Sequence, residues 1–158
     1  TFRSQFCGMI QLNFPTYKFK LKNRENKPLV WDPVRKKWVV LQPEEWVRQH
    51  CIAFLLEDKK YPLELINVEK KIQLNGRSKR YDIIVFRPTG KPHILIECKA
   101  PTVSITQKSF DQIAQYNMAL NSTYLMVTNG MDHYFCQIDA AQTKYQFLKS
   151  LPIFKPSE

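Results

Sequence analysis

The fold is decided by residues 81–99, which read YDIIVFRPTGKPHILIECK. Two apolar runs flank a segment rich in Pro and Gly, a composition typical of two strands joined by a turn. A turn centred between Thr89 and Gly90 places Phe86 opposite His93. Both faces of the hairpin are then apolar along most of its length, which predicts two central strands of a sheet.

Charged residues gather at one end of this hairpin. The same register places Asp82 directly opposite Glu97, and the alternation of side chains puts Lys99 on the face of Glu97. Two opposed carboxylates repel, and burial raises the cost. A divalent cation resolves the conflict, because Mg²⁺ prefers oxygen ligands, and Lys99 can polarise a water beside it. The arrangement predicts metal-assisted hydrolysis of a phosphodiester. The structural alternative is an internal ion pair of Lys99 with Glu97 or Asp82.

Further elements extend outward from the hairpin on both sides. Their order predicts an α/β domain built on one mixed sheet. Before the hairpin we expect a strand at 17–22, a second hairpin of residues 29–31 and 38–41, a helix from about 44 to about 58 and a strand at 65–74. After it we expect a helix over 106–120, strands at 124–128 and 133–138, and a short element at 145–148.

Length and charge narrow the class of protein. The chain has 158 residues, the size of one domain. Its 24 Lys and Arg against 14 Asp and Glu give a net charge of +10, which favours a polyanionic partner, with nucleic acid ahead of an anionic membrane. The longest uninterrupted apolar run is residues 51–56, too short to span a membrane.

Glycine and cysteine spacing exclude several kinds of site. The four glycines lie too far apart for a Walker loop or a dinucleotide fingerprint, so no ATP site is expected. The four cysteines lack the paired spacing of a zinc site or a disulfide framework, and apolar neighbours favour small buried residues. This usage fits a reducing, cytoplasmic setting.

The beginning of the chain is set apart from the domain. It starts at Thr1, and Met9 resembles a natural start, so residues 1–8 are interpreted as vector-derived or upstream sequence. Residues 9–158 are expected to form a single domain, with N-terminal strands in 15–41 and a catalytic core in 43–140.

The charged end of the hairpin belongs to a larger pattern. Asp82 and Glu97-Cys98-Lys99 resemble the PD-(D/E)xK nuclease signature, and FDQIAQYN (110–117) and Thr128-Asn129-Gly130 follow downstream. The set resembles a short form of the N-terminal nuclease domain of the type I restriction enzyme R subunit, from about residue 12 to about residue 151. The resemblance implies a restriction-endonuclease-like mixed central sheet flanked by helices, with an extra N-terminal β region.

The resemblance also implies roles for particular residues. Asp82 and Glu97 match the metal-binding carboxylates, and Lys99 matches the catalytic lysine. Gln112 and Tyr116 match a Q-x-x-x-Y motif, in which Gln112 orients the lysine or the substrate and Tyr116 reaches a phosphate. The alternative for Gln112 and Tyr116 is a solvent-facing helix surface.

Two further carboxylates are candidates for the same site. Glu45 or Glu44, at the start of the first helix, matches a Glu that related nucleases carry near the metal. The alternative for Glu45 is a helix-start carboxylate paired with Arg48. Glu69 is an auxiliary ligand or, as we favour, a surface charge.

Basic residues next to Asp82 are candidates for DNA contact. They are Lys70, Lys71, Arg77, Lys79 and Arg80, and the expected loop 77–80 has the best claim because it runs into the catalytic strand. The alternative is a solvated basic face. Two other basic groups lie at 18–27 and 35–37. Trp31 and Trp38 are expected to pack within their hairpin, and the alternative is stacking on bases. We expect little direct reading of bases.

Together these features predict a Mg²⁺-dependent DNA endonuclease domain, with Mn²⁺ as a substitute metal. We expect it to lack the ATP-dependent motor of the type I R subunit, so its expected partners are DNA and a motor or other restriction-modification subunits. A double-strand break needs one of these subunits or a homodimer. The alternative is a catalytically silent DNA-binding or assembly module of a restriction-modification system, and RNA remains a third candidate substrate.

Overall fold

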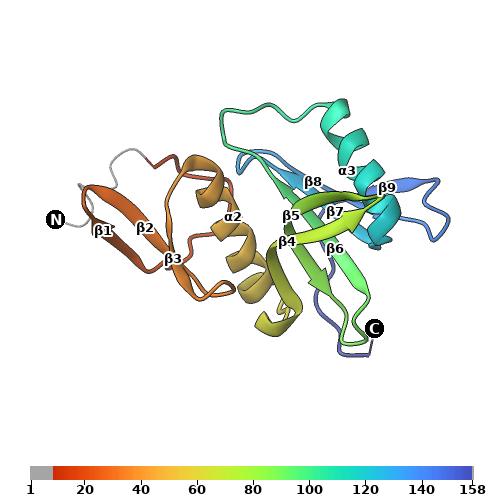
Figure 1. Ribbon diagram of the computed structural model, residues 1–158, viewed down its shortest axis with the longest axis horizontal. Helices are drawn as coiled ribbons and strands as arrows, with labels where there is room; N and C mark the ends of the chain where they lie inside the picture. The colour runs from red at the N-terminus through yellow and green to blue at the C-terminus, as the bar shows by residue number, and fades with distance from the viewer. Residues whose placement is uncertain (1–8, 158) are drawn as a thin grey trace.

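The computed structural model describes residues 9–157, and it contains two sheets and two main helices (Figure 1). The interpretation of residues 1–8, including Cys7, lies outside the described residues. Within the described part of the chain, no helix is both long enough and apolar enough to cross a lipid bilayer.

The larger sheet has six strands in the order β4-β5-β6-β7-β8-β9. Only β6 and β7 pair in parallel, and the other neighbours are antiparallel, so the expected mixed sheet is confirmed. The strands are β4 (Ile66–Leu74), β5 (Arg77–Phe86), β6 (Pro92–Cys98), β7 (Tyr124–Thr128), β8 (His133–Ile138) and β9 (Tyr145–Leu148).

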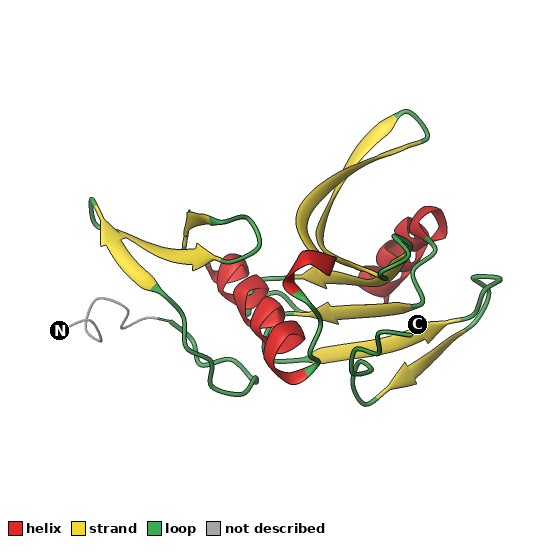
Figure 2. Ribbon diagram, turned by 90° about the horizontal axis from the view of Figure 1, so that it is seen from below, coloured by secondary structure: helices red, strands yellow, loops and turns green. Residues whose placement is uncertain are grey.

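The two helices cover opposite faces of this sheet. Helix α2 (Pro43–Ala53) begins with Pro in its first turn and continues into a π-helical segment (Phe54–Asp58), while α3 (Gln107–Leu120) begins with a Thr106 capping box. One core joins α2 to the inner face of β5 and β6, and a second core joins α3 to the other face. The expected flanking helices are therefore confirmed (Figures 1 and 2).

An extra sheet of three antiparallel strands lies beside α2 (Figure 1). It comprises β1 (Leu21–Arg24), β2 (Lys27–Asp32) and β3 (Lys37–Val40), with Trp31 paired to Trp38 as the second expected hairpin requires. The strand expected at 17–22 is wrong in its position. Tyr17 instead donates a hydrogen bond to Asp58 at 2.7 Å, and its ring packs against His50. These tertiary contacts override the alternating pattern.

The predicted register of the central hairpin is confirmed over residues 83–85, and the predicted pair of Asp82 and Glu97 lies one position beyond this ladder. Ile83 pairs with Ile96 and Ile84 with Leu95, and all four side chains are buried. The expected pairing of Phe86 with His93 is wrong, because the register shifts after Val85 and Phe86 pairs with Pro92. In an irregularity of this kind one strand has an extra, unpaired residue, and the pairs on the far side of it from the turn keep their register.

The predicted loop 77–80 is also wrong, because these residues open β5. Arg80 pairs with Lys71 and Lys79 with Ile72, so the turn shortens to Asn75 and Gly76. The resulting β4–β5 hairpin extends away from the rest of the sheet (Figure 2). The basic residues of this hairpin therefore lie on two paired strands and not on a loop.

Gly130 allows the N-terminal segment to lie close to α2. Its φ is +87°, and an added Cβ would lie 2.8 Å from Leu12 Cδ2 and 3.0 Å from Val47 Cγ2. We expect Gly130→Ala to lower the free energy of unfolding by about 2–4 kcal/mol, since backbone strain and overpacking add. Gly90→Ala is the control, because Gly90 also has positive φ but nothing within 4 Å. Equal losses in urea unfolding of the two variants would contradict the close packing.

Candidate active site

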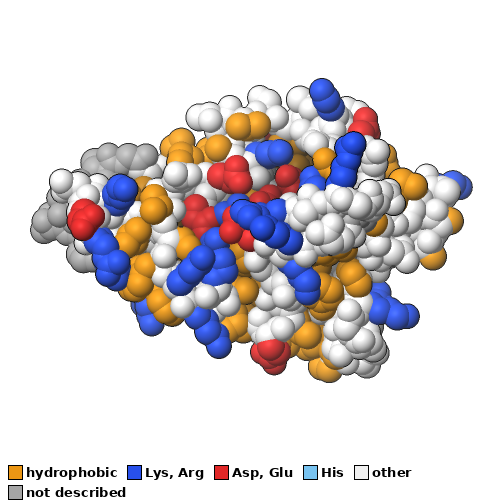
Figure 3. Space-filling model, viewed as in Figure 1, with side chains coloured by type: hydrophobic (Ala, Val, Ile, Leu, Met, Phe, Trp, Pro, Cys, Tyr) orange, Lys and Arg blue, Asp and Glu red, His pale blue; other side chains and the backbone are white. Residues whose placement is uncertain are grey.

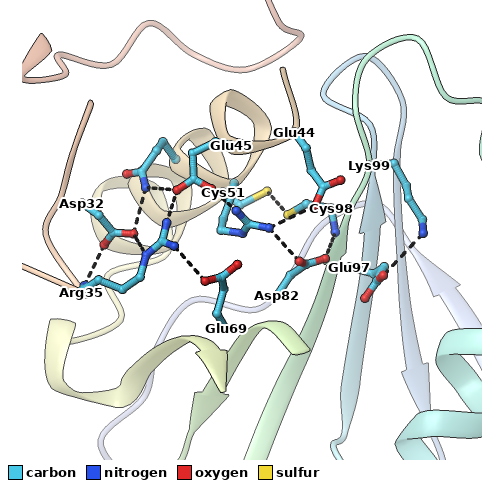
Figure 4. Close-up of polar contacts among 12 residues, drawn as sticks. Asp32, Arg35, Glu44, Glu45, Cys51, Glu69, Asp82, Glu97, Cys98 and Lys99 are labelled. Carbon is cyan, nitrogen blue, oxygen red and sulfur yellow. Dashed lines mark hydrogen bonds and ion pairs between the residues drawn. The ribbon is translucent and has the colours of Figure 1, made fainter. Parts of the chain in front are cut away.

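Three predicted residues meet at the end of the central hairpin (Figure 4). Asp82 immediately precedes Ile83, whose pairing with Ile96 ends the ladder on this side, and its Oδ2 accepts a hydrogen bond from the backbone N–H of Cys98 at 2.8 Å. Lys99 Nζ lies 3.5 Å from Glu97 Oε1. The side chains of Glu97 and Lys99 are 24% and 30% exposed, so the group is accessible from solvent. The structure therefore brings Asp82, Glu97 and Lys99 together as predicted.

The position of Lys99 depends on a strand that comes later in the chain. Its backbone N–H donates to the carbonyl of Thr128 at 2.8 Å, at the end of the parallel β6–β7 pair. Helix α3 provides the crossover between these parallel strands. The backbone of Lys99 is thus fixed by the sheet and does not begin a free loop.

Arg48 of α2 holds the other oxygen of Asp82. Its Nη2 donates to Asp82 Oδ1 at 2.9 Å and to Glu44 Oε1 at 3.1 Å, and its Nη1 donates to Glu45. The Arg48 side chain is only 7% exposed. Burial lowers the pKa of Arg48, but the hydrogen bond and the charge of Asp82 outweigh this effect and raise it above its ordinary value. Arg48 therefore offsets part of the repulsion between Asp82 and Glu97. From the sequence we expected a metal ion alone to do so.

The ion pairs continue from Arg48 into the three-stranded sheet. Arg35 follows β2 and donates to Asp32 at 2.6 Å, to Glu69 at 3.1 Å and to Glu45. Asp32 is fully buried and also accepts from Gln49 of α2 at 3.0 Å. Two guanidinium groups thus join β2, α2, β4 and β5 through their carboxylates (Figure 4). The network fixes α2 against the hairpin that carries the site.

Glu69 and Asp82 are skipped between two neighbouring pairs of the β4–β5 ladder, Val68 with Ile83 and Lys70 with Tyr81. Its φ is +53°, an uncommon value for a residue within a strand. Arg35 holds its carboxylate, whose side chain is 33% exposed. The predicted surface charge is therefore half-buried and tied to the ion-pair network.

Glu97 has a strongly perturbed acidity. Burial and the nearby charge of Asp82 raise the pKa of Glu97 from 4.5 to about 7, and Lys99 and Lys79 oppose the rise without cancelling it. A carboxylate whose charged form is disfavoured in this way binds added positive charge readily. Such shifts are typical of functional sites, although structural ion pairs also produce them.

This acidity gives stability a pH dependence with a defined sign. Between pH 4.5 and about 7 the folded protein retains the Glu97 proton and the unfolded chain does not. The contribution of this carboxyl is therefore full below pH 4.5 and is lost as the pH rises to about 7. Glu97→Gln is expected to flatten this fall and to be more stable than wild type at alkaline pH. Urea unfolding across this range, with the exposed Glu64→Gln as control, measures the effect. Parallel curves for wild type and Glu97→Gln would contradict it.

The predicted Q-x-x-x-Y pair lies on α3 beside the site. Gln112 Nε2 donates to the Tyr116 hydroxyl at 3.0 Å, and Lys79 Nζ lies 2.9 Å from the centre of the Tyr116 ring. Lys79 and Gln112 together lower the pKa of Tyr116 below its ordinary value. The charge of Glu97 opposes the lowering of the Tyr116 pKa, and Lys79 in turn lowers the pKa of Glu97. The motif is therefore coupled electrostatically to the carboxylates.

The remaining basic candidates lie on the β4–β5 hairpin. Lys71 and Arg80 form a cross-strand pair of exposed residues, and Arg77 is exposed near the tip. Lys70 Nζ packs 4.7 Å from the Phe86 ring centre. In Figure 3 Lys and Arg side chains lie on both sides of a central group of acidic ones. This face of the molecule therefore carries an acidic centre with basic flanks.

Two carboxylates, Asp82 and Glu97, are the oxygen donors that would hold a metal ion, although each oxygen of Asp82 also accepts one hydrogen bond. Asp82 and Glu97 offer hard oxygen donors beside solvent, which suits Mg²⁺ because it keeps several waters and uses one or two carboxylates. Among residues 9–157, no three His, Cys, Asp or Glu side chains form a group that could hold a metal ion. Glu45 pairs with Arg48, as the structural alternative predicts, and also with Arg35, and its metal role stays a prediction.

The roles of Arg48 and Lys79 at the site were not predicted from the sequence. Arg48 was considered only as a partner of Glu45 and Glu44, although it lies one residue after Val47 on a helix face directed toward the sheet. A basic residue among buried helix positions was the available signal. Lys79 was assigned to DNA binding alone, and its contact with Tyr116 follows from the extension of β5, which local patterns did not indicate.

Comparison with known proteins identifies relatives of this chain. A family model described as the type I restriction enzyme R protein N terminus matches residues 43–152. No curated protein matches the chain. A solved fragment of a protein described as an HsdR subunit of a type I restriction enzyme from Vibrio vulnificus YJ016 is 21% identical, with a TM-score of 0.42. That match covers 59% of this chain and 19% of the Vibrio chain.

Proposed function

This chain belongs to the family of the type I restriction enzyme R protein N terminus, and from this membership we propose that it is a metal-dependent endonuclease domain that hydrolyses DNA phosphodiesters. The observation that carries the proposal is the meeting of Asp82, Glu97 and Lys99 at one end of the central hairpin. The raised pKa of Glu97 supports it, because this carboxylate is poised to accept a cation. The proposed substrate implies a cytoplasmic location.

Asp82 and Glu97 are the residues that would hold Mg²⁺, with Mn²⁺ as a substitute. When bound, the metal supplies a Lewis acid and lowers the pKa of a coordinated water. Lys99 orients the attacking water and offsets negative charge that develops on the phosphoryl oxygens. Arg48 keeps the Asp82 carboxylate in one orientation. In this proposal Tyr116 and Lys79, which contact each other, hold a neighbouring phosphate of the cut strand.

One observation favours a second candidate, a catalytically silent DNA-binding or assembly module. Both oxygens of Asp82 already accept a hydrogen bond, one from Arg48 and one from the backbone of Cys98. Such a module uses Asp82 as a structural partner of α2 and retains the basic hairpin. In either case we propose that other restriction-modification subunits, a motor among them, complete the activity. A homodimer is the other route to a double-strand break.

A cleavage assay on supercoiled plasmid distinguishes the nuclease from the silent module. Incubation with the chain and Mg²⁺ or Mn²⁺ is expected to produce nicked circles, and EDTA is expected to prevent them. Single-stranded DNA and RNA serve as competing substrates in the same assay. If the plasmid stays intact while the chain binds DNA in a salt-sensitive way, the nuclease proposal is wrong and the silent module takes its place.

DNA binding is expected to depend on the exposed pair Lys71 and Arg80. Neutralising both with Lys71→Gln and Arg80→Gln should reduce the slope of log K against log salt for duplex DNA by about 2, one for each lost phosphate contact. Fluorescence anisotropy at several salt concentrations measures the slope. Lys91→Gln with Lys149→Gln is a control of equal charge. If the slope stays at the wild-type value, the phosphates lie elsewhere on the protein.

A further inference from the structure

The three-stranded sheet contacts α2 through one face, and its other face carries mostly exposed or partly exposed side chains, although Leu29 on that face is only 8% exposed. On the packed face Val30 is fully buried, and Asp32 bonds Gln49 of α2. Residues directly opposite in antiparallel strands share a face, so Trp31 and Trp38 lie on the other side, in a row with Lys20. The backbone bond from Trp31 N–H to the Lys20 carbonyl at 3.0 Å fixes this row.

A second row on the same outer face adds cationic side chains. Lys22 lies opposite Leu29, which lies opposite Val40, and Arg24 lies opposite Lys27. The outer face therefore carries two tryptophans beside four basic residues, Lys20, Lys22, Arg24 and Lys27. Val40 is 46% exposed, and three of the four basic residues are exposed.

The two tryptophans are not used to build the described cores. Their rings meet edge to face with centroids 5.5 Å apart, and both remain partly exposed. Lys22 Nζ lies 4.2 Å from the centre of the Trp38 ring. Within residues 9–157, neither tryptophan belongs to the two hydrophobic cores that fix the helices to the six-stranded sheet. Two large aromatic side chains on an outer face are thus held in place without being covered by either core.

We propose that this outer face binds single-stranded DNA, with bases stacked on Trp31 and Trp38 and phosphates held by Lys20, Lys22 and Arg24. A base presents a flat π-face to an aromatic ring, and its backbone presents the charge that the lysines offset, whereas a paired base in a duplex cannot stack in this way. The proposal rests on the proposed function, because it assigns DNA as the partner. It places a strand-holding surface on the side of α2 opposite the carboxylate site (Figure 1).

Tryptophan fluorescence provides a direct test, because the sequence has only three tryptophans. An oligo(dT) strand is expected to quench the wild-type emission. Trp31→Leu with Trp38→Leu is expected to weaken binding by about tenfold or more, from loss of base stacking. Trp46→Phe is the matched control, since Trp46 packs against Phe19 and His50, and it should retain the quenching and the affinity.

A second pair of variants avoids any dependence on folding of the tryptophan variant. Lys20→Gln with Lys22→Gln should weaken oligo(dT) binding and reduce its salt slope, whereas Lys91→Gln with Lys149→Gln should leave both unchanged. Wild-type affinity in the Trp31→Leu, Trp38→Leu protein would overturn the inference. Equal competition by duplex DNA of the same length would overturn it too. Plasmid that stays intact while the quenching depends on both tryptophans would defeat the nuclease proposal and leave this surface in place.

Discussion

Lys99→Ala is expected to reduce the rate of plasmid nicking by about 10²–10³-fold or more, as removal of one electrostatic donor from an active site typically does. The Lys99 ammonium lies beside Glu97, where it can offset charge on the reacting phosphate. DNA affinity should stay near the wild-type value, because a single partly buried lysine is a small part of the basic surface. Nicking rates and anisotropy measured on the same preparations separate the two effects.

The control for this experiment is Lys149→Ala, an exposed lysine next to β9 and outside the site. It should nick plasmid at the wild-type rate. Equal nicking by wild type and Lys99→Ala would show that the lysine only neutralises Glu97. That result would support the internal ion pair that the sequence left open as an alternative.

Arg48→Met should lower the free energy of unfolding by about 3–5 kcal/mol, the usual cost of removing one partner from a buried ion pair. The substitution leaves Asp82 without its Arg48 hydrogen bond, and Glu45 loses one of its two arginine partners. Asp82→Asn should cost less, because Arg48 keeps Glu44 and Glu45. Urea unfolding of each variant gives the values.

The double variant Arg48→Met, Asp82→Asn tests the pairing itself. It should be more stable than Arg48→Met alone, since the uncompensated Asp82 charge is gone. Arg80→Met, on the exposed part of β5, is the control and should stay within about 0.5 kcal/mol of wild type. Additive losses in the double variant would mean that Arg48 and Asp82 are not coupled.

The central hairpin could be predicted because its information is local. Alternating strand geometry and one short turn were enough to bring Asp82, Glu97 and Lys99 to one end. The same local rules placed α2 and α3, where Pro43 and Thr106 mark the starts. Spacing along α3 also placed Gln112 next to Tyr116.

Other features could not be predicted because distant residues determine them. Arg48 and Asp82 are 34 positions apart, and nothing in either segment indicates the other. The position of Tyr17 depends on Asp58 and His50, which outweigh an alternating pattern that is typical of a strand. The register shifts after Val85, so the register predicted from the turn is correct for Ile83, Ile84 and Val85 and incorrect for Phe86.

The hydrogen bond between Lys99 N–H and the Thr128 carbonyl has a consequence for the order of folding. The β5–β6 hairpin closes a short loop and can form early, which brings Asp82 and Glu97 together. Parallel pairing of β6 with β7 must wait until the intervening helix is in place. In a nascent chain that ends before β7, Asp82 and Glu97 therefore lie close together while the backbone of Lys99 still lacks its hydrogen bond. The arrangement of Asp82, Glu97 and Lys99 is complete only after the chain through Thr128 has folded.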